Sequence, residues 1–329
     1  MATSVNAAFS EFNKDVVNLV SDKTKVARAS RDWLFGQLEN LPNKISDFPV
    51  LYDGMHIRFG SFARNTKIRP LDDIDMILTF AAQGSTYNMQ SYGKSYLIDV
   101  PETATNLRKL CDDNGRLNSI RLVNKLVSSL AQIEHYKKAE LHRRQEAATL
   151  QLTSYEWVFD IVPAFYTDTG YYLIPDGSGG WKATDPRVDQ TRVTEINQQH
   201  SGAILQIIRT LKYWNRRPIM PTIPSYLFEN IILNYYATRS SISDWIDANL
   251  IEFWAHLSTA IFGSVLDPKG FQGELNDLSV EDKLKISAKA TEANQKGFEA
   301  YQFETRDSDQ EKAINKWREV FGDEFPEYG

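Results

Sequence analysis

The spacing of apolar residues divides the chain into a first part that mixes helices with strands and a second part that is helical. Apolar side chains recur at helical spacing over residues 7–41 and predict one long amphipathic helix that ends at Pro42. Strand-like segments follow at 55–60, 73–80, 148–154 and 156–166, with a helical pattern at about 117–136. Residues 167–187 contain the DG and GSGG sequences typical of a hairpin and a loop, with Trp181 as a packing anchor beneath it.

The pattern changes after Pro186, and from about residue 195 it indicates helices only. One helix is expected over the sequence SGAILQIIRTLKYWNRR, and another begins at Ser225. Near the end of the chain, small residues recur at helical spacing over 286–300 and would let a helix pack closely against a neighbour. A chain of 329 residues is long enough to form two cores. We therefore expect an α+β, bilobal fold, with lobes at 1–186 and 187–329.

Composition and charge narrow the classes of function. Lys and Arg number 37 against 43 Asp and Glu, so the net charge of −6 disfavours broad binding to long duplex nucleic acid. The basic run Lys137, Lys138, Arg143 and Arg144 is typical of a solvated helix end. The single cysteine, Cys111, excludes a disulfide framework and a cysteine-based zinc cluster. No apolar run of about 18 residues and no signal-peptide pattern is present, so a cytoplasmic protein without membrane contact is expected.

The stretch GSFARNTKIRPLDDIDMIL, residues 60–78, carries candidate chemistry. Asp73 and Asp75 are two residues apart on an expected strand, so both carboxylates point to one face. Two like charges at that distance repel unless a cation lies between them, and Mg²⁺ prefers such oxygen ligands. Gly60 lets the backbone approach a ligand closely, and Ser61 offers a hydroxyl and an N–H to a phosphate. Asp72 falls on the opposite face and is expected to be solvated or capping.

A third acid, Asp160, lies in the apolar segment EWVFDIVPAF. A carboxylate in such a strand is unfavourable unless it is paired or bound to metal. If this strand lies beside 73–80, three carboxylates converge, as two-metal phosphoryl chemistry requires. Each feature alone has an ordinary structural explanation, but their conjunction predicts a metal-dependent nucleotidyltransferase site.

With these motifs, the sequence resembles the polymerase-β-type nucleotidyltransferase superfamily. Within it, the sequence is similar to the bacterial CD-NTases, relatives of animal cyclic GMP–AMP synthase and oligoadenylate synthetase. Besides GSFARNTKIRPLDDIDMIL, the matching pieces are FDIVPAF, YLIPDGSGGWKATDP, IIRTLKYWNRR, PSYLFENIIL and AINKWREVFGDEFP. The resemblance implies a nucleotidyltransferase core with a mixed sheet and a long N-terminal helix, and a helical lobe that completes the nucleotide-binding cleft.

The resemblance also implies roles for single residues. The catalytic acids that would ligate two Mg²⁺ ions, or Mn²⁺, are Asp73, Asp75 and Asp160. The residues that would bind substrate are Gly60 and Ser61 at the phosphates, Lys212 at the triphosphate, Ser225 at phosphate and Tyr226 stacked on a base. From the residues alone, other interpretations stay open: Lys212 as a surface lysine, Ser225 as a helix N-cap and Tyr226 as a core residue.

By this resemblance the chain joins nucleoside triphosphates into a cyclic di- or trinucleotide second messenger and releases pyrophosphate. The family's usual role is antiphage signalling, with a separate effector protein that reads the product and, in some members, a regulatory partner. Two alternatives remain: a template-independent or tRNA-directed nucleotidyltransferase, and an inactive nucleotide-binding regulator. The bases, the linkage, the ring size, the activator, the oligomeric state and any conjugation through Gly329 stay open.

Overall fold

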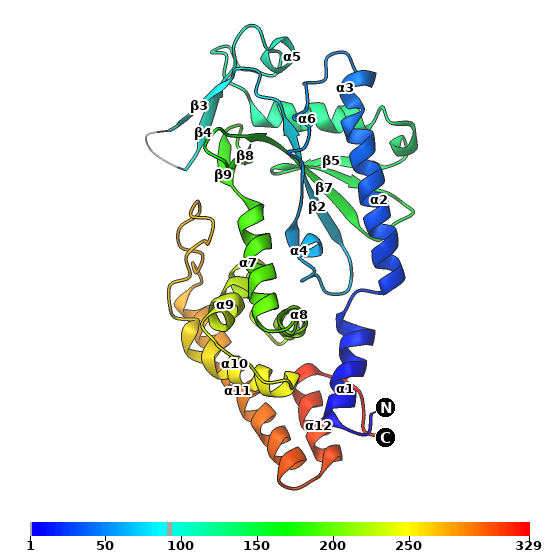
Figure 1. Cartoon of the computed structure of the whole chain (residues 1–329), viewed down its shortest axis with the longest axis vertical. Helices are drawn as coiled ribbons and strands as arrows, with labels where there is room; N and C mark the ends of the chain where they lie inside the picture. The colour runs from blue at the N-terminus through cyan, green and yellow to red at the C-terminus, as the bar shows by residue number, and fades with distance from the viewer. Residues whose placement is uncertain (1, 91–93) are drawn as a thin grey trace. The chain divides into compact units, whose positions relative to one another are not determined.

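The computed structural model describes residues 2–90 and 94–329, which fold into two compact units (Figure 1). One unit, here the sheet unit, comprises residues 21–64 and 71–190; the other, the helical unit, comprises 1–20, 65–70 and 191–329. The sequence places a boundary at 186, whereas the chain changes unit between residues 190 and 191, inside helix α7 (Pro186–Gln199). The helical unit also contains residues 1–20 and 65–70, which precede this boundary. No single boundary along the sequence therefore separates the two units.

The sheet unit is built on one mixed sheet, and this confirms the expected α+β class. Nine strands of the described residues form it, in the order β1-β2-β7-β8-β9-β4-β3, with β6 also on β7 and β5 on β6. Their bounds are β1 Ile57–Phe59, β2 Asp73–Phe80, β3 Thr86–Met89, β4 Tyr96–Asp99, β5 Glu140–Arg144, β6 Ala147–Gln151, β7 Val158–Tyr166, β8 Tyr172–Pro175 and β9 Trp181–Thr184. Strands β2 and β7 are parallel, and the other strand pairs of this sheet are antiparallel within the described residues.

Helices pack against this sheet within the sheet unit. Helix α6 (Ser119–Leu130) lies against β5 to β8, and its N-cap Asn118 accepts from the backbone N–H of Arg121. The short helices α3 (Leu41–Lys44), α4 (Gly60–Ala63) and α5 (Thr105–Arg108) and a 3₁₀ turn at Glu134–Tyr136 connect the longer elements. The indole of Trp181 is fully buried and donates from Nε1 to the carbonyl of Leu117 at 3.1 Å. The expected anchor beneath the hairpin is therefore confirmed.

The continuous helix expected over residues 7–41 is wrong, because the chain leaves the helix at Asn18. Helix α1 (Val5–Phe12) runs into a π-helical turn at Asn13–Val17, and the long helix α2 (Ser21–Glu39) starts afresh. Asn18 is extended, with φ −76° and ψ 147°, and its amide donates to the Oε1 atom of Gln206 at 2.9 Å. This long-range hydrogen bond fixes the end of the first helix in the helical unit, and α2 belongs to the sheet unit.

The solvated helix end expected at the basic run is confirmed for Lys137, the exposed C-cap of the 3₁₀ turn, but it is wrong for Arg143 and Arg144. Residues Glu140–Arg144 form strand β5, which pairs with β6, and Arg143 and Arg144 are exposed on it. Charged side chains are common on strands at the edge of a sheet, where they oppose pairing with another chain. A charged strand of this kind has no apolar alternation, so the sequence pattern does not distinguish it from a helix end.

The helical unit has an aromatic core. With α1 and the part of α7 from residue 191, its helices include α8 (Ile204–Asn215), α9 (Ser225–Ala237), α10 (Ile246–Ala260), α11 (Val280–Thr305) and α12 (Gln310–Phe321). The rings of Phe9 and Trp317 meet edge to face with centroids 4.9 Å apart. The expected small-residue stripe is confirmed on α11: a Cβ on Gly297 would lie 2.7 Å from Ile251 Cγ1 and 3.0 Å from Trp317 Cη2.

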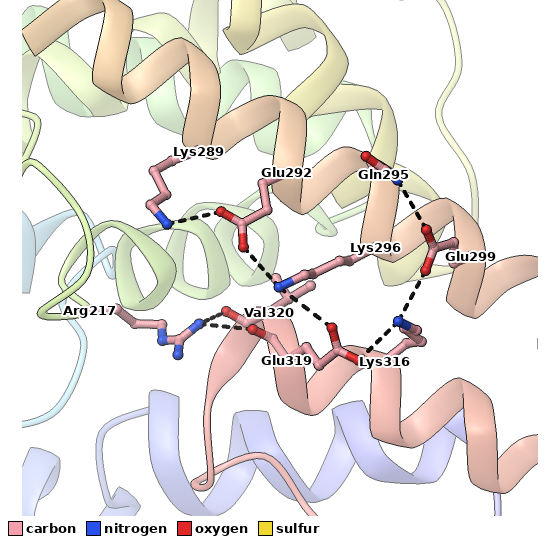
Figure 2. Close-up of polar contacts among 9 residues, drawn as sticks. All are labelled: Arg217, Lys289, Glu292, Gln295, Lys296, Glu299, Lys316, Glu319 and Val320. Atoms are coloured by element: carbon pink, nitrogen blue, oxygen red, sulfur yellow. Dashed lines mark hydrogen bonds and ion pairs between the residues drawn. The ribbon is translucent and has the colours of Figure 1, made fainter.

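Ion pairs join α11 to α12 along their solvent side. Figure 2 shows the carboxylates of Glu292, Glu299 and Glu319 each bonded to one or two lysines from the same two helices. Hydrogen bonds from Lys296 and Lys289 lower the pKa of Glu292 to about 2. Every carboxylate of this network is thus compensated by a cation.

Within residues 2–90 and 94–329, no helix combines the length and the apolar character that crossing a bilayer requires.

Candidate functional site

The three predicted acids lie on the two parallel strands of the sheet unit. In the register of β2 and β7, Asp75 is the partner of Asp160, and Asp73 is the partner of Val158. Partner positions on adjacent strands share a face, and so do residues two apart on one strand. The structure therefore brings the carboxylates of Asp73, Asp75 and Asp160 to one face of the sheet. All three residues are half-buried.

Asp160 is the acid whose electrostatic environment is most perturbed. Burial raises the pKa of its carboxyl group, and the nearby charge of Asp73 raises it further. The hydroxyl of Thr149 on β6 donates to Asp160 Oδ1 at 2.9 Å, which opposes this rise and fixes one oxygen. A desolvated carboxylate near another is a favourable place for a cation.

Gly60 supports Asp75 from the neighbouring strand. Strand β1 pairs antiparallel with β2, so that Phe59 is the partner of Asp75, and Gly60 follows at the start of α4. Gly60 has φ +75°, and a Cβ there would lie 1.8 Å from Asp75 Oδ2. The Asp75 carboxylate therefore rests on the bare Gly60 backbone, and Ser61 is the next residue of this turn. Only glycine fits this position.

Asp72 differs from its neighbours as expected. Its side chain is exposed, and its backbone carbonyl accepts from the N–H of Val158 at 2.9 Å. The backbone of Asp72 thus takes part in strand pairing, and its side chain is exposed. Asp72 is therefore a suitable control residue for substitutions of Asp73 and Asp75.

Lys212 is half-buried in the helical unit and its ammonium is paired, so the surface-lysine interpretation is wrong. Its side chain is 10% exposed and forms a short ion pair with Glu229, which is 3% exposed. The Lys212 ammonium also donates to Thr66 Oγ1 at 3.2 Å, and the Thr66 hydroxyl donates to Glu229 Oε2 at 2.9 Å. Glu229 was not predicted as a site residue. A lone acid inside the apolar run SYLFENIIL is the sequence signal that could have found it.

Tyr226 is half-buried in the same unit and is held by two side chains from the loop after α10. Its hydroxyl donates to Asp267 Oδ1 at 2.9 Å, and Lys269 Nζ donates to that hydroxyl at 2.6 Å. Lys269 Nζ also lies 4.0 Å from the ring centroid, which is a cation–π contact. Burial alone would raise the pKa of Asp267, but backbone N–H donors, Lys269 and Tyr226 together hold it below its usual value. Sequence reasoning missed both Asp267 and Lys269.

Ser225 is the first residue of α9 and is exposed. The capping position is Pro224, which has no side-chain donor or acceptor, so the N-cap interpretation of Ser225 is wrong. The predicted residues thus fall into two groups: the acids, Gly60 and Ser61 in the sheet unit, and Lys212, Ser225 and Tyr226 in the helical unit.

The acids offer suitable donor atoms but not a formed coordination sphere. Within the ranges 2–90 and 94–329, no three His, Cys, Asp or Glu side chains are arranged to hold a metal ion. The one cysteine, Cys111, is buried. Hard carboxylate oxygens on a common face nevertheless match the ligands that Mg²⁺ takes. The three carboxylates therefore provide the type of ligand atom that Mg²⁺ binds. Their side chains would have to turn towards each other to coordinate one ion.

Comparison with known proteins decides the family. No family model matches the sequence. The chain is 48% identical, over all of its length and 99% of the relative's, to a probable cyclic nucleotide synthase of Bacillus cereus (strain VD146). The chain belongs to the bacterial CD-NTase family. It is accordingly a nucleotidyltransferase that produces a cyclic oligonucleotide, which confirms the family and the enzyme class expected from the motifs.

A more distant relative and two solved structures are also similar to the chain. A cyclic AMP-AMP-AMP synthase of Acinetobacter sp. is 24% identical over 51% of this chain and 50% of its own. Among solved structures, CdnC of E. coli MS115-1, in complex with HORMA-deltaN, superposes with a TM-score of 0.71 at 17% identity and covers 98% of both chains. Apo DncV of Vibrio cholerae gives a TM-score of 0.68 at 13% identity, over 98% of this chain and 96% of its own.

Proposed function

We propose that this CD-NTase joins nucleoside triphosphates into a cyclic di- or trinucleotide at a magnesium-dependent site formed by Asp73, Asp75 and Asp160. The observation that carries the proposal is the parallel register of β2 and β7, which makes Asp75 the partner of Asp160. Two carboxylates at partner positions and a third two residues away are the ligands that phosphoryl transfer with divalent ions uses.

The acids would hold Mg²⁺, or Mn²⁺, which when bound supplies charge neutralisation at the transferred phosphate. The remaining tasks belong to the protein. Thr149 keeps Asp160 Oδ1 in place, so the other oxygen of this carboxylate is the candidate acceptor for the proton of the attacking sugar hydroxyl. The raised pKa of Asp160 suits a proton acceptor. The bare Gly60 backbone leaves the space that the Asp75 carboxylate occupies.

Contacts with substrate are proposed for each group of residues within its own unit. Gly60 and Ser61 would contact the triphosphate from the sheet unit, while Ser225 would donate its hydroxyl to a phosphate and Tyr226 would stack on a base. Because the Lys212 ammonium is already paired with Glu229, it would bind triphosphate only by sharing that contact. Stacking on a tyrosine stabilises a bound base by about 1–3 kcal/mol.

The biological role we propose is antiphage signalling in the cytoplasm, with a separate effector protein that reads the product. A regulatory protein partner is part of the proposal, because the solved CdnC relative is a complex with a HORMA protein. An RNA-directed nucleotidyltransferase would need a surface that docks RNA, and the net charge of −6 disfavours it.

The test uses purified protein, all four nucleoside triphosphates and Mg²⁺, without RNA. We expect pyrophosphate release and a phosphatase-resistant product whose mass gives the bases and the ring size. Asp75→Asn and Asp160→Asn should abolish both, whereas the matched control Asp72→Asn should keep them. Mn²⁺ binding followed by electron paramagnetic resonance gives a readout that does not need turnover. A strict requirement for RNA, or Mn²⁺ binding that survives both substitutions, would contradict the proposal.

A further inference from the structure

A cavity of about 280 Å³ lies within the helical unit, and none of the predicted nucleotide-site residues lines it. Three segments of this unit form its walls: the start of α1, the start of α10 and the end of α11. The lining residues are Val5, Asn6, Phe9, Trp245, Ile246, Asp247, Ala248, Tyr301, Glu304 and Thr305. The cavity is therefore a property of one unit and is separate from the residues assigned to catalysis.

Aromatic side chains form much of the wall. Phe9 is fully buried, whereas Trp245 is 58% exposed and Tyr301 is 43% exposed. Exposed aromatic side chains beside a hollow are typical of places where a ligand or a partner side chain inserts. The faces of such rings attract cations.

Two carboxyl groups, Asp247 and Glu304, line the same cavity without a cationic partner. Asp247 is only 7% exposed, and within residues 2–90 and 94–329 no ion pair joins a lysine or arginine to either group. Glu304 accepts a hydrogen bond from Gln310 Nε2 at 3.3 Å. Burial raises the pKa of both groups. Backbone N–H donors of Ala248 and Asp247 partly oppose this rise at Asp247, while the charge of Asp247 raises the pKa of Glu304 further.

This arrangement differs from the remainder of the same helix. Figure 2 shows that Glu292 and Glu299 on α11 are bonded to lysines, and Glu304 lies five residues beyond Glu299. A buried carboxylate without a cation is unfavourable, and it becomes favourable when a cation enters and its hydrogen bonds are satisfied. The charge of the cavity is thus complementary to a positively charged ligand.

We propose that this cavity is a second binding site, which takes an organic cation bearing an ammonium or guanidinium group. The cation would bond to Asp247 and Glu304, and its apolar stem would lie against Phe9, Trp245 and Tyr301. The volume of about 280 Å³ is sufficient for one such group and its apolar stem. Such a group can come from a free polyamine or from an arginine side chain of a partner protein.

The experiment titrates the full-length protein by calorimetry with two probes, one for each source. N-acetyl-arginine amide represents a protein side chain, and N-acetyl-citrulline amide is its uncharged isostere; spermidine represents a free polyamine. We expect saturable binding of the arginine probe, of spermidine, or of both. If the arginine probe binds, the citrulline probe should bind at least about tenfold more weakly.

Two variants assign the binding to the cavity. Asp247→Asn and Glu304→Gln keep the shape and remove one charge each, so each should weaken the bound probe by at least about tenfold. Asp277→Asn, an exposed acid of the same unit outside the cavity wall, should leave binding unchanged. Unchanged melting temperatures would show that the variants fold. Absence of saturable binding by both cations, or binding that both cavity variants keep, would overturn the proposal.

Discussion

The contact between Gly60 and Asp75 makes the candidate site unusually sensitive to one methyl group. In Gly60→Ala, the new Cβ would lie 1.8 Å from Asp75 Oδ2, 2.7 Å from Cγ and 3.0 Å from Cβ of the same side chain. Ordinary van der Waals contact begins at about 3.4 Å, so the carboxylate oxygen must move by about 1.6 Å. The substitution therefore displaces a proposed metal ligand without changing its identity.

Two costs follow from this substitution, and they can be separated. The positive φ of +75° strains an alanine by about 1–2 kcal/mol. Misplacing a catalytic group by about 1 Å reduces turnover by about 100-fold. The backbone strain acts on stability, whereas the displacement of the Asp75 carboxylate acts on catalysis.

Gly54 provides the matched control, because its φ is +77° and nothing lies within 4 Å of the position of its Cβ. We expect Gly54→Ala to lose about 1–2 kcal/mol in urea unfolding and Gly60→Ala to lose at least as much, because its Cβ also displaces the Asp75 side chain. Only Gly60→Ala should lose about 100-fold in pyrophosphate release. If the two variants turn over substrate within a few-fold of each other, the Gly60 backbone does not position a catalytic carboxylate.

Three further predictions concern other parts of the molecule. Asp160→Asn should abolish product formation. It should not lower the melting temperature in metal-free buffer, because it removes a charge that burial and the nearby charge of Asp73 make unfavourable. A lower melting temperature would contradict this expectation. Lys212→Met should lose about 3–5 kcal/mol in urea unfolding by leaving the buried Glu229 carboxylate unpaired, and the double variant with Glu229→Gln should regain much of it. Gly297→Ala should lose about 1–3 kcal/mol by overpacking, whereas Gly36→Ala, in open space on α2, should gain up to about 1 kcal/mol by the same measurement.

Local pattern was sufficient for the strand that carries the first two acids. The alternation in DIDMILTF predicts strand 73–80 and a common face for Asp73 and Asp75, and β2 has those bounds. The side-chain period of a strand depends only on its own backbone, so this inference needs no other part of the chain. The same reasoning located the segment that contains Asp160.

Contacts between residues far apart in the sequence determined the other features of the fold and of the candidate site. Which residue lies opposite Asp75 depends on the register between strands about 85 residues apart, and a slip of one residue would turn Asp160 to the other face. The helix break at Asn18 depends on Gln206, and the pairing of Lys212 depends on Glu229 and Thr66. The cavity at Asp247 and Glu304 is formed by three segments that only folding brings together. The sequence thus determined which chemical groups are present and which side chains of one helix or strand share a face. Tertiary packing determined which groups from distant segments meet, because such meetings depend on long-range contacts that no local pattern encodes.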